Sequence, residues 1–231
     1  MFDKNGIIVL NKATGMSSSL AVSIVKRTIH PNKIGHLGTL DPLGTGLLLL
    51  AVNKATKLFD LYLKKNKTYR ATFKFGLETD TFDSEGNITK TDDCNIKLDD
   101  VIKATKTLIG HQHQLPPMYS AKKINGKKAY ELARQGIEVE LKTREVDIYK
   151  FECLEEIEKN TFSFEIECSA GTYIRSLCRD IATKLSTCGV MVSIIRTKCG
   201  VFSLEDSTTL EQIKNNCYHF FETNEKGEII G

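Results

Sequence analysis

The sequence lacks several features that would place a protein in a class at once. It has no tryptophan, and only four of its 231 residues are proline. No apolar run approaches the roughly 18 residues that a membrane-spanning helix needs. The start of the chain has too short an apolar stretch for a secretory signal and carries an acid at Asp3. These absences argue against a membrane or secreted protein, so we expect a cytoplasmic protein without a membrane partner.

Cysteine patterns that bind zinc or form disulfides are also lacking. The seven cysteines are odd in number, and no two of them form a C-x-x-C motif. Cysteines without such spacing usually act as small buried hydrophobes. His111 and His113 could begin a metal site, but no cluster of Cys, Asp or Glu lies near them in the sequence. We therefore interpret both histidines as part of a surface loop and expect no bound metal.

Acidic residues are missing from two basic stretches. Residues 64–74 hold five cations and residues 122–128 hold four, although the net charge of the chain is only +3. A single short run of lysines is usually just a solvated surface, but two such runs indicate a basic face of the kind that binds a phosphate backbone. The candidate phosphate contacts are Lys64, Lys65, Lys67, Lys122, Lys123 and Lys127.

Four segments have the apolar patterns of strands. Residues 6–12 and 47–52 are short apolar runs typical of buried strands. Residues 68–75 and 161–168 alternate between apolar and polar side chains, which is the pattern of a strand with one buried face.

Other segments have apolar residues at helical spacing. Ser19 is placed to cap a helix, and Asn53 to cap another with Ala55, Leu58, Phe59 and Tyr62 on one side. Residues 174–185 and a stretch through Ala129, Leu132 and Ala133 also predict helices. Strands and helices mix without regular βαβ alternation, so we predict an α+β fold with a mixed, mainly antiparallel central sheet, flanked by helices and loops.

The stretch "GHLGTLDPLGTG", residues 35–46, has four glycines and a single carboxylate, Asp41. A tight turn in which Asp41 bonds its own backbone would explain an ordinary Asp-Pro loop. This loop is long for a turn, however, and it leads directly into a buried apolar strand. A loop residue held on a rigid support is a common place for a catalytic group.

This stretch, continued as "LLLLAVNKATKL", resembles the central motif of the TruB family of tRNA pseudouridine-55 synthases. Further motifs resemble that family in the same order along the chain: "VLNKATGMSSS", "KTYRATFKFG", "PPMYSAKKINGKKAYELAR", "CSAGTYIRSLCRDIA" and "RTKCGVF". Together they cover roughly residues 7 to 210, so the sequence is identified as a member of the family.

The resemblance implies the pseudouridine synthase fold and an isomerase that needs no cofactor. Its substrate is the T-arm stem-loop of tRNA, where a flipped uracil leaves C1′ of its ribose and rejoins it through C5. Only 21 residues follow Leu210. We therefore expect residues 1–231 to form a single catalytic domain, without a full-length C-terminal RNA-binding (PUA-like) domain, and to act as a monomer.

The resemblance also implies roles for individual residues. Asp41 takes the place of the essential aspartate, as covalent nucleophile or as base, and Arg175 pairs with it. Tyr69 stacks on the flipped uracil. The implied substrate-binding residues are His36, Tyr173, Ile194 and Lys12.

The chemistry fits these residue types. Flipping a base out of an RNA loop costs a few kcal/mol, and stacking on an aromatic ring such as Tyr69 returns about 1–3 kcal/mol. Burial against the base disfavours an ionised carboxylate, and an arginine such as Arg175 would favour it. A non-catalytic RNA-binding or RNA-folding protein is the alternative. A hydrolase ranks last, because no partner acid for Asp41 stands in the motifs.

Overall fold

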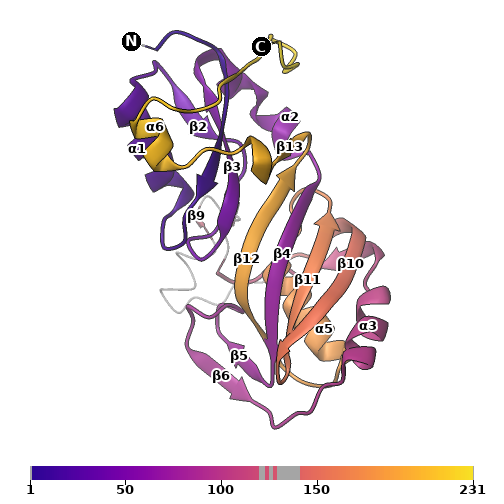
Figure 1. Cartoon of the computed structure of the whole chain (residues 1–231). Coiled ribbons are helices and arrows are strands. Elements are labelled where there is room, and N and C mark those ends of the chain that lie inside the picture. Colours follow the sequence, from indigo (N-terminus) through magenta and orange to yellow (C-terminus); the bar gives the residue numbers. More distant parts are fainter. Residues whose placement is uncertain (1, 120–122, 125–126, 129–140, 231) are drawn as a thin grey trace. The chain divides into compact units, whose positions relative to one another are not determined.

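The computed structural model describes residues 2–119, 123–124, 127–128 and 141–230 (Figure 1). The chain forms two compact units. Unit 1 consists of residues 1–70 and 194–231, and unit 2 consists of residues 71–193. The boundaries between the units fall inside two strands, β4 (Lys67–Phe75) and β12 (Gly189–Cys199).

The strands of unit 1 follow the order β14-β1-β3-β12-β4. They include β1 (Gly6–Lys12), β3 (Thr45–Val52) and β14 (Phe221–Glu222), with β2 (Ile34–His36) beside β3 and β13 (Phe202–Ser203) beside β12. The pairs β1–β3, β1–β14, β2–β3 and β12–β13 are antiparallel, and β3–β12 is parallel.

The helices of unit 1 are α1 (Ser18–Ile29), α2 (Phe59–Leu63) and α6 (Leu210–Lys214), with 3₁₀ helices at Asn53–Leu58 and Leu204–Asp206. The apolar runs of β1 and β3 supply most of the core, together with Leu58, Tyr62 and Phe202. These two strands read as continuous apolar runs because they are buried on both faces.

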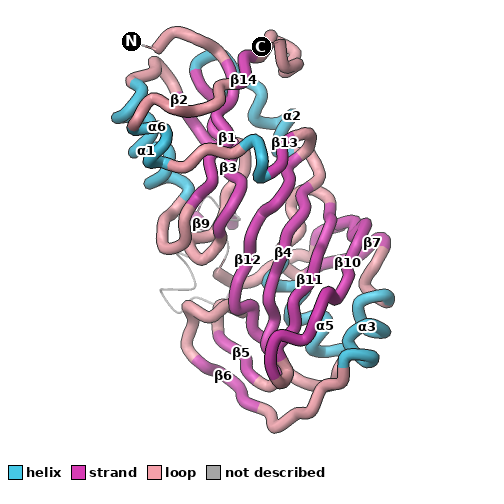
Figure 2. The backbone as a smooth tube through the Cα atoms, in the orientation of Figure 1, coloured by secondary structure: helices cyan, strands magenta, loops and turns pink. Residues whose placement is uncertain are grey.

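The strands of unit 2 follow the order β12-β4-β11-β10-β7. Here β7 (Gly110–Gln114), β10 (Arg144–Glu158) and β11 (Thr161–Cys168) pair antiparallel. The helices α3 (Leu98–Lys106) and α5 (Ile174–Lys184) contact each other, and α3 contacts β10 (Figure 2). Among its described residues, the unit also holds two small hairpins: β5–β6 (Leu77–Thr79, Ile88–Thr91) and β8–β9 (Lys123–Ile124, Lys127–Lys128).

Aromatic rings form the core of unit 2. Phe73 of β4 lies 4.8 Å from Phe164 of β11, measured between ring centroids, and Phe151 of β10 packs edge-on against both. The alternation in residues 68–75 and 161–168 is therefore confirmed, since the apolar residues of each strand face this core. The mixed, mainly antiparallel α+β architecture is confirmed as well.

The expected helix caps are wrong in two places. Ser17, not Ser19, caps α1, because its side chain accepts the N–H of Leu20. Asn53 caps no helix: its amide donates to the carbonyls of Phe2 and Lys4. The helix after Asn53 begins as a 3₁₀ turn, and its three-residue repeat leaves Phe59 41% exposed instead of buried.

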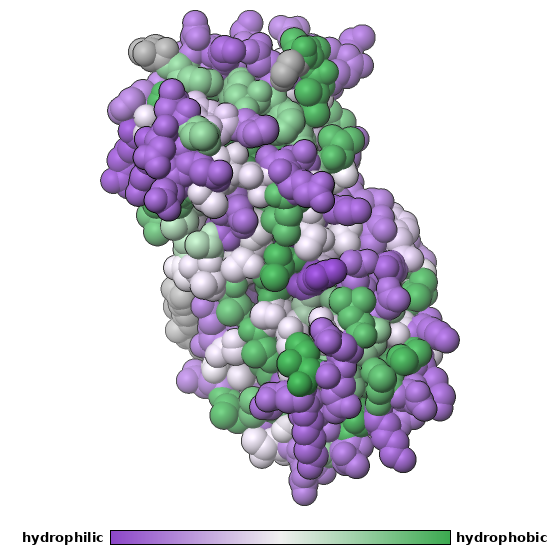
Figure 3. All heavy atoms as spheres, in the orientation of Figure 1, coloured by the Kyte–Doolittle hydropathy of each residue, from purple (hydrophilic) through white to green (hydrophobic). Residues whose placement is uncertain are grey.

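The expectation of a loop around His111 and His113 is wrong. Both residues lie in strand β7, which is paired with β10. The helix expected through Ala129, Leu132 and Ala133 lies outside the described residues. In the part of the chain that the structure describes, no helix is long and apolar enough to cross a membrane. Hydrophilic side chains cover much of the face drawn in Figure 3, with hydrophobic groups scattered among them.

Candidate active site

Asp41 lies in the loop between β2 and β3 and is half-buried. Its carbonyl oxygen accepts the N–H of Gly44 at 3.0 Å, which closes a tight turn. Gly38 and Gly46, on either side, have backbone φ angles of 128° and 90°. Such angles strain any residue with a Cβ atom, so these two glycines let the chain turn sharply around Asp41.

Contacts from the amino-terminal segment of unit 1 hold both neighbours of Asp41. The hydroxyl of Ser18 donates to the carbonyl of Leu40 at 2.8 Å and accepts its N–H at 2.9 Å. The carbonyl of Pro42 accepts the N–H of Gly15 at 2.9 Å and lies 3.3 Å from the ammonium of Lys12. The backbone that carries Asp41 is therefore fixed on both sides.

Lys12 is fully buried, which is rare for a lysine. Its ammonium donates to the carbonyls of Ala13 and Met16 at 2.9 and 2.6 Å, as well as to Pro42. Hydrogen bonds of this kind compensate the cost of burying a charge. These contacts join the 13–16 turn to the Asp41 loop, and a contact of Lys12 with substrate stays a prediction.

Arg196 on β12 was given no role by the sequence, although it stands in the motif "RTKCGVF". Its side chain is buried in unit 1 and donates to three carbonyls: Leu47 at 2.7 Å, Thr39 at 3.3 Å and Gly38 at 3.4 Å. One guanidinium thus anchors the start of the Asp41 loop to β3. The motif alone could not reveal this, because the acceptors lie about 150 residues away in the sequence.

His36 ends β2 in unit 1 and is half-buried. Its Nδ1 atom has no hydrogen-bond partner among the described residues. Burial, and then the positive charge of Arg196, lower the pKa of His36 below its usual value of about 6.5. The imidazole is therefore neutral at pH 7.

The two predicted base contacts of unit 1 lie on strands. Tyr69 is 8% exposed and belongs to the buried face of β4. Ile194 on β12 is 7% exposed, and its carbonyl accepts the hydroxyl of Thr45 at 3.3 Å. The stacking of Tyr69 on uracil and the base contact of Ile194 stay predictions.

The predicted phosphate contacts differ in exposure. Lys64 and Lys65 are exposed. Lys67 is buried, and its ammonium donates to the carbonyls of Leu63 and Lys65 at 2.6 Å. Lys64 and Lys65 are therefore better placed for phosphate than Lys67. Lys122, and the side chains of Lys123 and Lys127, lie outside the described residues.

Tyr173 and Arg175 belong to unit 2, where Tyr173 is the N-cap residue of α5. The side-chain amide of the buried Gln114 binds the backbone of Tyr173 twice: it accepts the N–H at 2.8 Å and donates to the carbonyl at 3.1 Å. The guanidinium of Arg144 lies 5.9 Å from the centre of the Tyr173 ring. The start of α5 is therefore fixed to β7.

Arg175 is 6% exposed and donates to the carbonyls of Thr81 and Tyr119, each at 2.9 Å. An Nη atom of its guanidinium also lies 3.5 Å from a carboxylate oxygen of Asp83, which is equally buried. Asp83 in turn accepts the hydroxyl of Thr81 at 2.7 Å and the N–H of Glu85 at 3.1 Å. Asp83 could not be singled out from the sequence, because it stands in a polar turn region with no pattern of its own.

Each unit thus orders one part of the predicted site. Unit 1 fixes the Asp41 loop through Lys12, Ser18 and Arg196, and unit 2 fixes Tyr173 and Arg175. The pairing of Arg175 with Asp41 stays a prediction.

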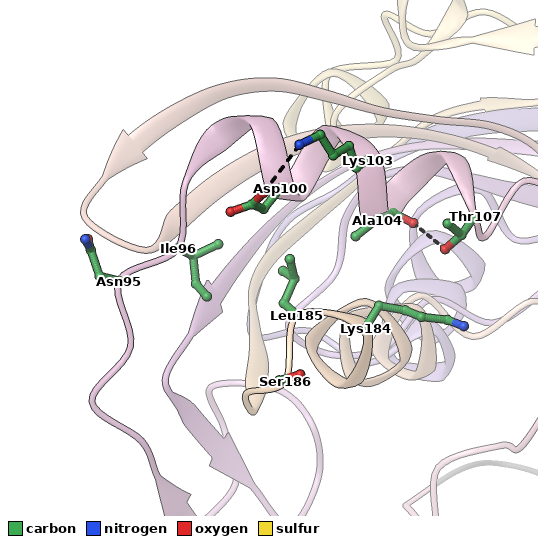
Figure 4. Close-up of a pocket in the computed structure, with 9 residues that line it drawn as sticks. All are labelled: Asn95, Ile96, Asp100, Lys103, Ala104, Thr107, Lys184, Leu185 and Ser186. Carbon is green, nitrogen blue, oxygen red and sulfur yellow. Dashed lines mark hydrogen bonds and ion pairs between the residues drawn. The ribbon is translucent and has the colours of Figure 1, made fainter.

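A separate open cavity of about 500 Å³ lies in unit 2, between α3 and the end of α5 (Figure 4). Its lining includes Asp100 and Lys103 of α3, which form an ion pair at 3.8 Å, and Lys184 of α5. None of the predicted site residues that the structure describes lines it.

Solved structures with the same fold define the class of protein. A chain in a Cbf5-Nop10-Gar1 complex has 29% sequence identity and a TM-score of 0.72, over 91% of the present chain and 54% of that chain. A chain in an H/ACA RNP bound to a substrate RNA containing 2′-deoxyuridine has 27% identity and a TM-score of 0.68, over 91% and 52% of the two chains. The present chain spans about half the length of each. The fold is that of the pseudouridine synthases.

Family comparisons are more specific. The family model described as the N-terminal domain of TruB family pseudouridylate synthases matches residues 26–174, and that of the tRNA pseudouridylate synthase B C-terminal domain matches residues 175–229. The tRNA pseudouridine synthase B of Alkaliphilus oremlandii is 43% identical over 91% of this chain and 70% of its own. That of Clostridium tetani is 42% identical over 96% and 77%. The chain belongs to the TruB family, as the motifs predicted.

Proposed function

We propose that this protein is a tRNA pseudouridine synthase that converts uridine 55 in the T loop of tRNA to pseudouridine. Two observations support the proposal. The chain belongs to the TruB family, and relatives that are named tRNA pseudouridine synthase B share about 40% of its residues. The residue types that the reaction needs are all present, at Asp41, Tyr69 and Arg175.

The reaction breaks the bond between C1′ and N1 and forms a bond between C1′ and C5. N1 gains a proton, and the hydrogen on C5 is lost to water. The uracil must first leave the stacked RNA loop, because a stacked base is inaccessible to the enzyme. In this proposal the ring of Tyr69, fixed on β4, offers the replacement stacking surface.

The fixed backbone around Asp41 is the observation that carries the mechanism. A catalytic carboxylate must be held close to the reacting carbon, since loose placement forfeits most of the rate gain. Ser18 and Lys12 fix the residues on both sides of Asp41, and Arg196 fixes the start of its loop. Asp41 then acts on the ribose, as nucleophile at C1′ or as base toward the sugar.

Arg175 has the second role. Its two carbonyl contacts and the carboxylate of Asp83 hold the guanidinium in one orientation. A guanidinium fixed in this way can pair with a carboxylate without first losing the freedom of its side chain. We propose that it stabilises the ionised form of Asp41 when the base excludes water from the site.

Tritium release tests this function. A T-arm stem-loop with tritium at C5 of its uridines loses tritium to water only when C5 forms its new bond. We expect release by the unaltered protein, none by Asp41→Ala, and undiminished release by Asp60→Asn, a change at an exposed aspartate of α2. If the unaltered protein binds the stem-loop without releasing tritium, the protein is an RNA-binding protein and the proposed activity is wrong.

The same proposal covers the smallest sufficient substrate, the oligomeric state and the place of action. We expect the T-arm stem-loop to suffice as substrate, a single copy of the chain to carry the whole reaction, and the enzyme to act in the cytoplasm, where tRNA is used. Turnover of the isolated stem-loop, and a mass near 25.9 kDa by light scattering during turnover, would support these expectations. A dimeric mass would contradict the second.

A further inference from the structure

Two histidines and two acids share one exposed patch of unit 2. His111 and His113 stand two residues apart on β7, so their side chains lie on the same face of the strand. In the antiparallel pairing of β7 with β10, His113 lies opposite Glu145 and His111 lies opposite Asp147. Directly opposite residues share a face of the sheet. The four side chains therefore form a polar cluster, which we call the histidine patch.

Three of these side chains can bind one metal ion together. One ligand atom each from His111, His113 and Glu145 lie within 4.8 Å of one another. In a tetrahedral zinc site, with bonds of about 2.0–2.2 Å, neighbouring ligand atoms are roughly 3.4 Å apart. All three residues are exposed, so small side-chain rotations can close the remaining distance.

Asp147 supplies the contact that usually orients a histidine ligand. Its carboxylate lies 3.0 Å from Nδ1 of His111. An aspartate in this position fixes the proton on Nδ1 and leaves Nε2 free to coordinate, as in many natural zinc sites. The patch thus has ligands and an orienting group in the arrangement that zinc sites use.

We propose that the histidine patch binds a divalent transition-metal ion of the zinc type, with His111, His113 and Glu145 as ligands and Asp147 as a positioning residue. Two imidazoles and one carboxylate suit Zn²⁺ and disfavour Mg²⁺, which prefers oxygen ligands. Water completes the coordination. The ion links β7, the last strand in the order of unit 2, to its neighbour β10.

This link has a consequence beyond the patch. Gln114 follows His113 directly and binds both backbone groups of Tyr173 at the start of α5. An ion that fixes β7 to β10 therefore also stabilises the support of Tyr173. The proposal does not depend on the proposed activity, because metal binding is measured without RNA.

Calorimetric titration with Zn²⁺ tests the proposal. We would use the full chain without an affinity tag and with Cys217→Ser, because the exposed Cys217 could itself bind zinc. We expect one Zn²⁺ per chain and no comparable binding of Mg²⁺. His113→Ala and Glu145→Gln should each weaken Zn²⁺ binding at least about tenfold, and Asp147→Asn about 10- to 100-fold. The control His219→Ala, at an exposed histidine outside the patch, should bind as tightly as its parent.

A spectroscopic readout locates the ion. One equivalent of Zn²⁺ should shift the imidazole ¹⁵N resonances of His111 and His113, and it should slow hydrogen exchange of the Tyr173 amide. Undiminished Zn²⁺ binding in either His113→Ala or Glu145→Gln would overturn the proposal. So would a parent protein that fails to bind Zn²⁺ at millimolar concentration.

Discussion

Asp83 and Arg175 form a buried ion pair whose carboxylate lies 3.5 Å from the guanidinium, with both side chains about 7% exposed. Removing one charge from such a pair leaves the other with less compensation in a low-dielectric site. The carboxylate of Asp83 also organises its own turn through Thr81 and Glu85. We therefore consider Asp83 a positioning residue for Arg175.

Asp83→Asn tests this role. We expect a stability loss of about 1.5–3 kcal/mol, the usual range for a lost hydrogen bond or contact to a charged group. We also expect kcat to fall at least about tenfold, with little change in KM, as the guanidinium loses its orientation. Urea unfolding and tritium release measure the two effects. Asp93→Asn, at an exposed aspartate in the same unit, is the matched control, and an equal loss there would refute the role.

The lowered pKa of His36 should make the stability of the folded protein depend on pH. Burial and the charge of Arg196 lower its pKa in the folded protein, so the unfolded chain binds a proton at a higher pH than the folded one. Stability must then fall as the pH drops from above the unfolded value of about 6.5 to the lower folded value. We expect the loss between pH 7.5 and 5.5, measured by urea unfolding, to be smaller in His36→Gln. An equal loss in both proteins would contradict the lowered pKa.

At the scale of elements, the parallel contact of β3 with β12 fixes the end of the Asp41 loop. Arg196 lies opposite Gly46 in this pairing. A Cβ atom at Gly46 would meet the carbonyl oxygen of Arg196 at 2.5 Å, and its φ of 90° disfavours other residues. Any other residue at this position therefore strains the strand pair.

Gly46→Ala should destabilise the protein by at least about 1–3 kcal/mol, because the change adds both backbone strain and a clash with backbone. Gly35→Ala is the matched control in the same motif, since a Cβ atom there meets nothing within 4 Å. We expect that control to change stability by less than about 0.5 kcal/mol. Thermal or urea unfolding measures the stability of the two variants. Similar losses of stability in both would show that the contact between β3 and β12 does not cause the loss in Gly46→Ala.

At the scale of the whole molecule, the small net charge of +3 means that RNA affinity depends on local basic clusters. Lys64 and Lys65 form such an exposed cluster beside the buried Lys67. Each phosphate contact contributes roughly 0.7–0.9 to the slope of log K against log salt. Lys64→Ala/Lys65→Ala should therefore lower the slope by about 1–2 and leave kcat at saturating RNA unchanged.

Fluorescence anisotropy with a T-arm stem-loop, at several salt concentrations, measures this slope. Lys97→Ala/Lys106→Ala removes two exposed lysines of unit 2, one just before α3 and one at its last residue, and is the matched control. If the slope changes equally in both double variants, Lys64 and Lys65 contribute no more to phosphate binding than exposed lysines elsewhere, and the prediction is wrong.

Sequence alone determined the features that repeat along the chain. The strands β1 and β3 follow from their continuous apolar runs, since they are buried on both faces, and β4, β11 and α5 follow from the regular spacing of their apolar residues, since they are buried on one face. The family followed from six motifs in a fixed order, and these motifs contain every residue to which a catalytic role was assigned.

Tertiary structure alone decided the contacts that join distant residues. Arg196 reaches carbonyls about 150 residues away, and Arg175 reaches the carbonyl of Thr81, 94 residues away. Lys12 is a basic residue that the fold buries, and Glu145 is an acid that strand pairing brings opposite His113. Such partners leave no local trace, because a hydrogen bond or an ion pair depends on the distance between atoms in space and not on their separation along the chain.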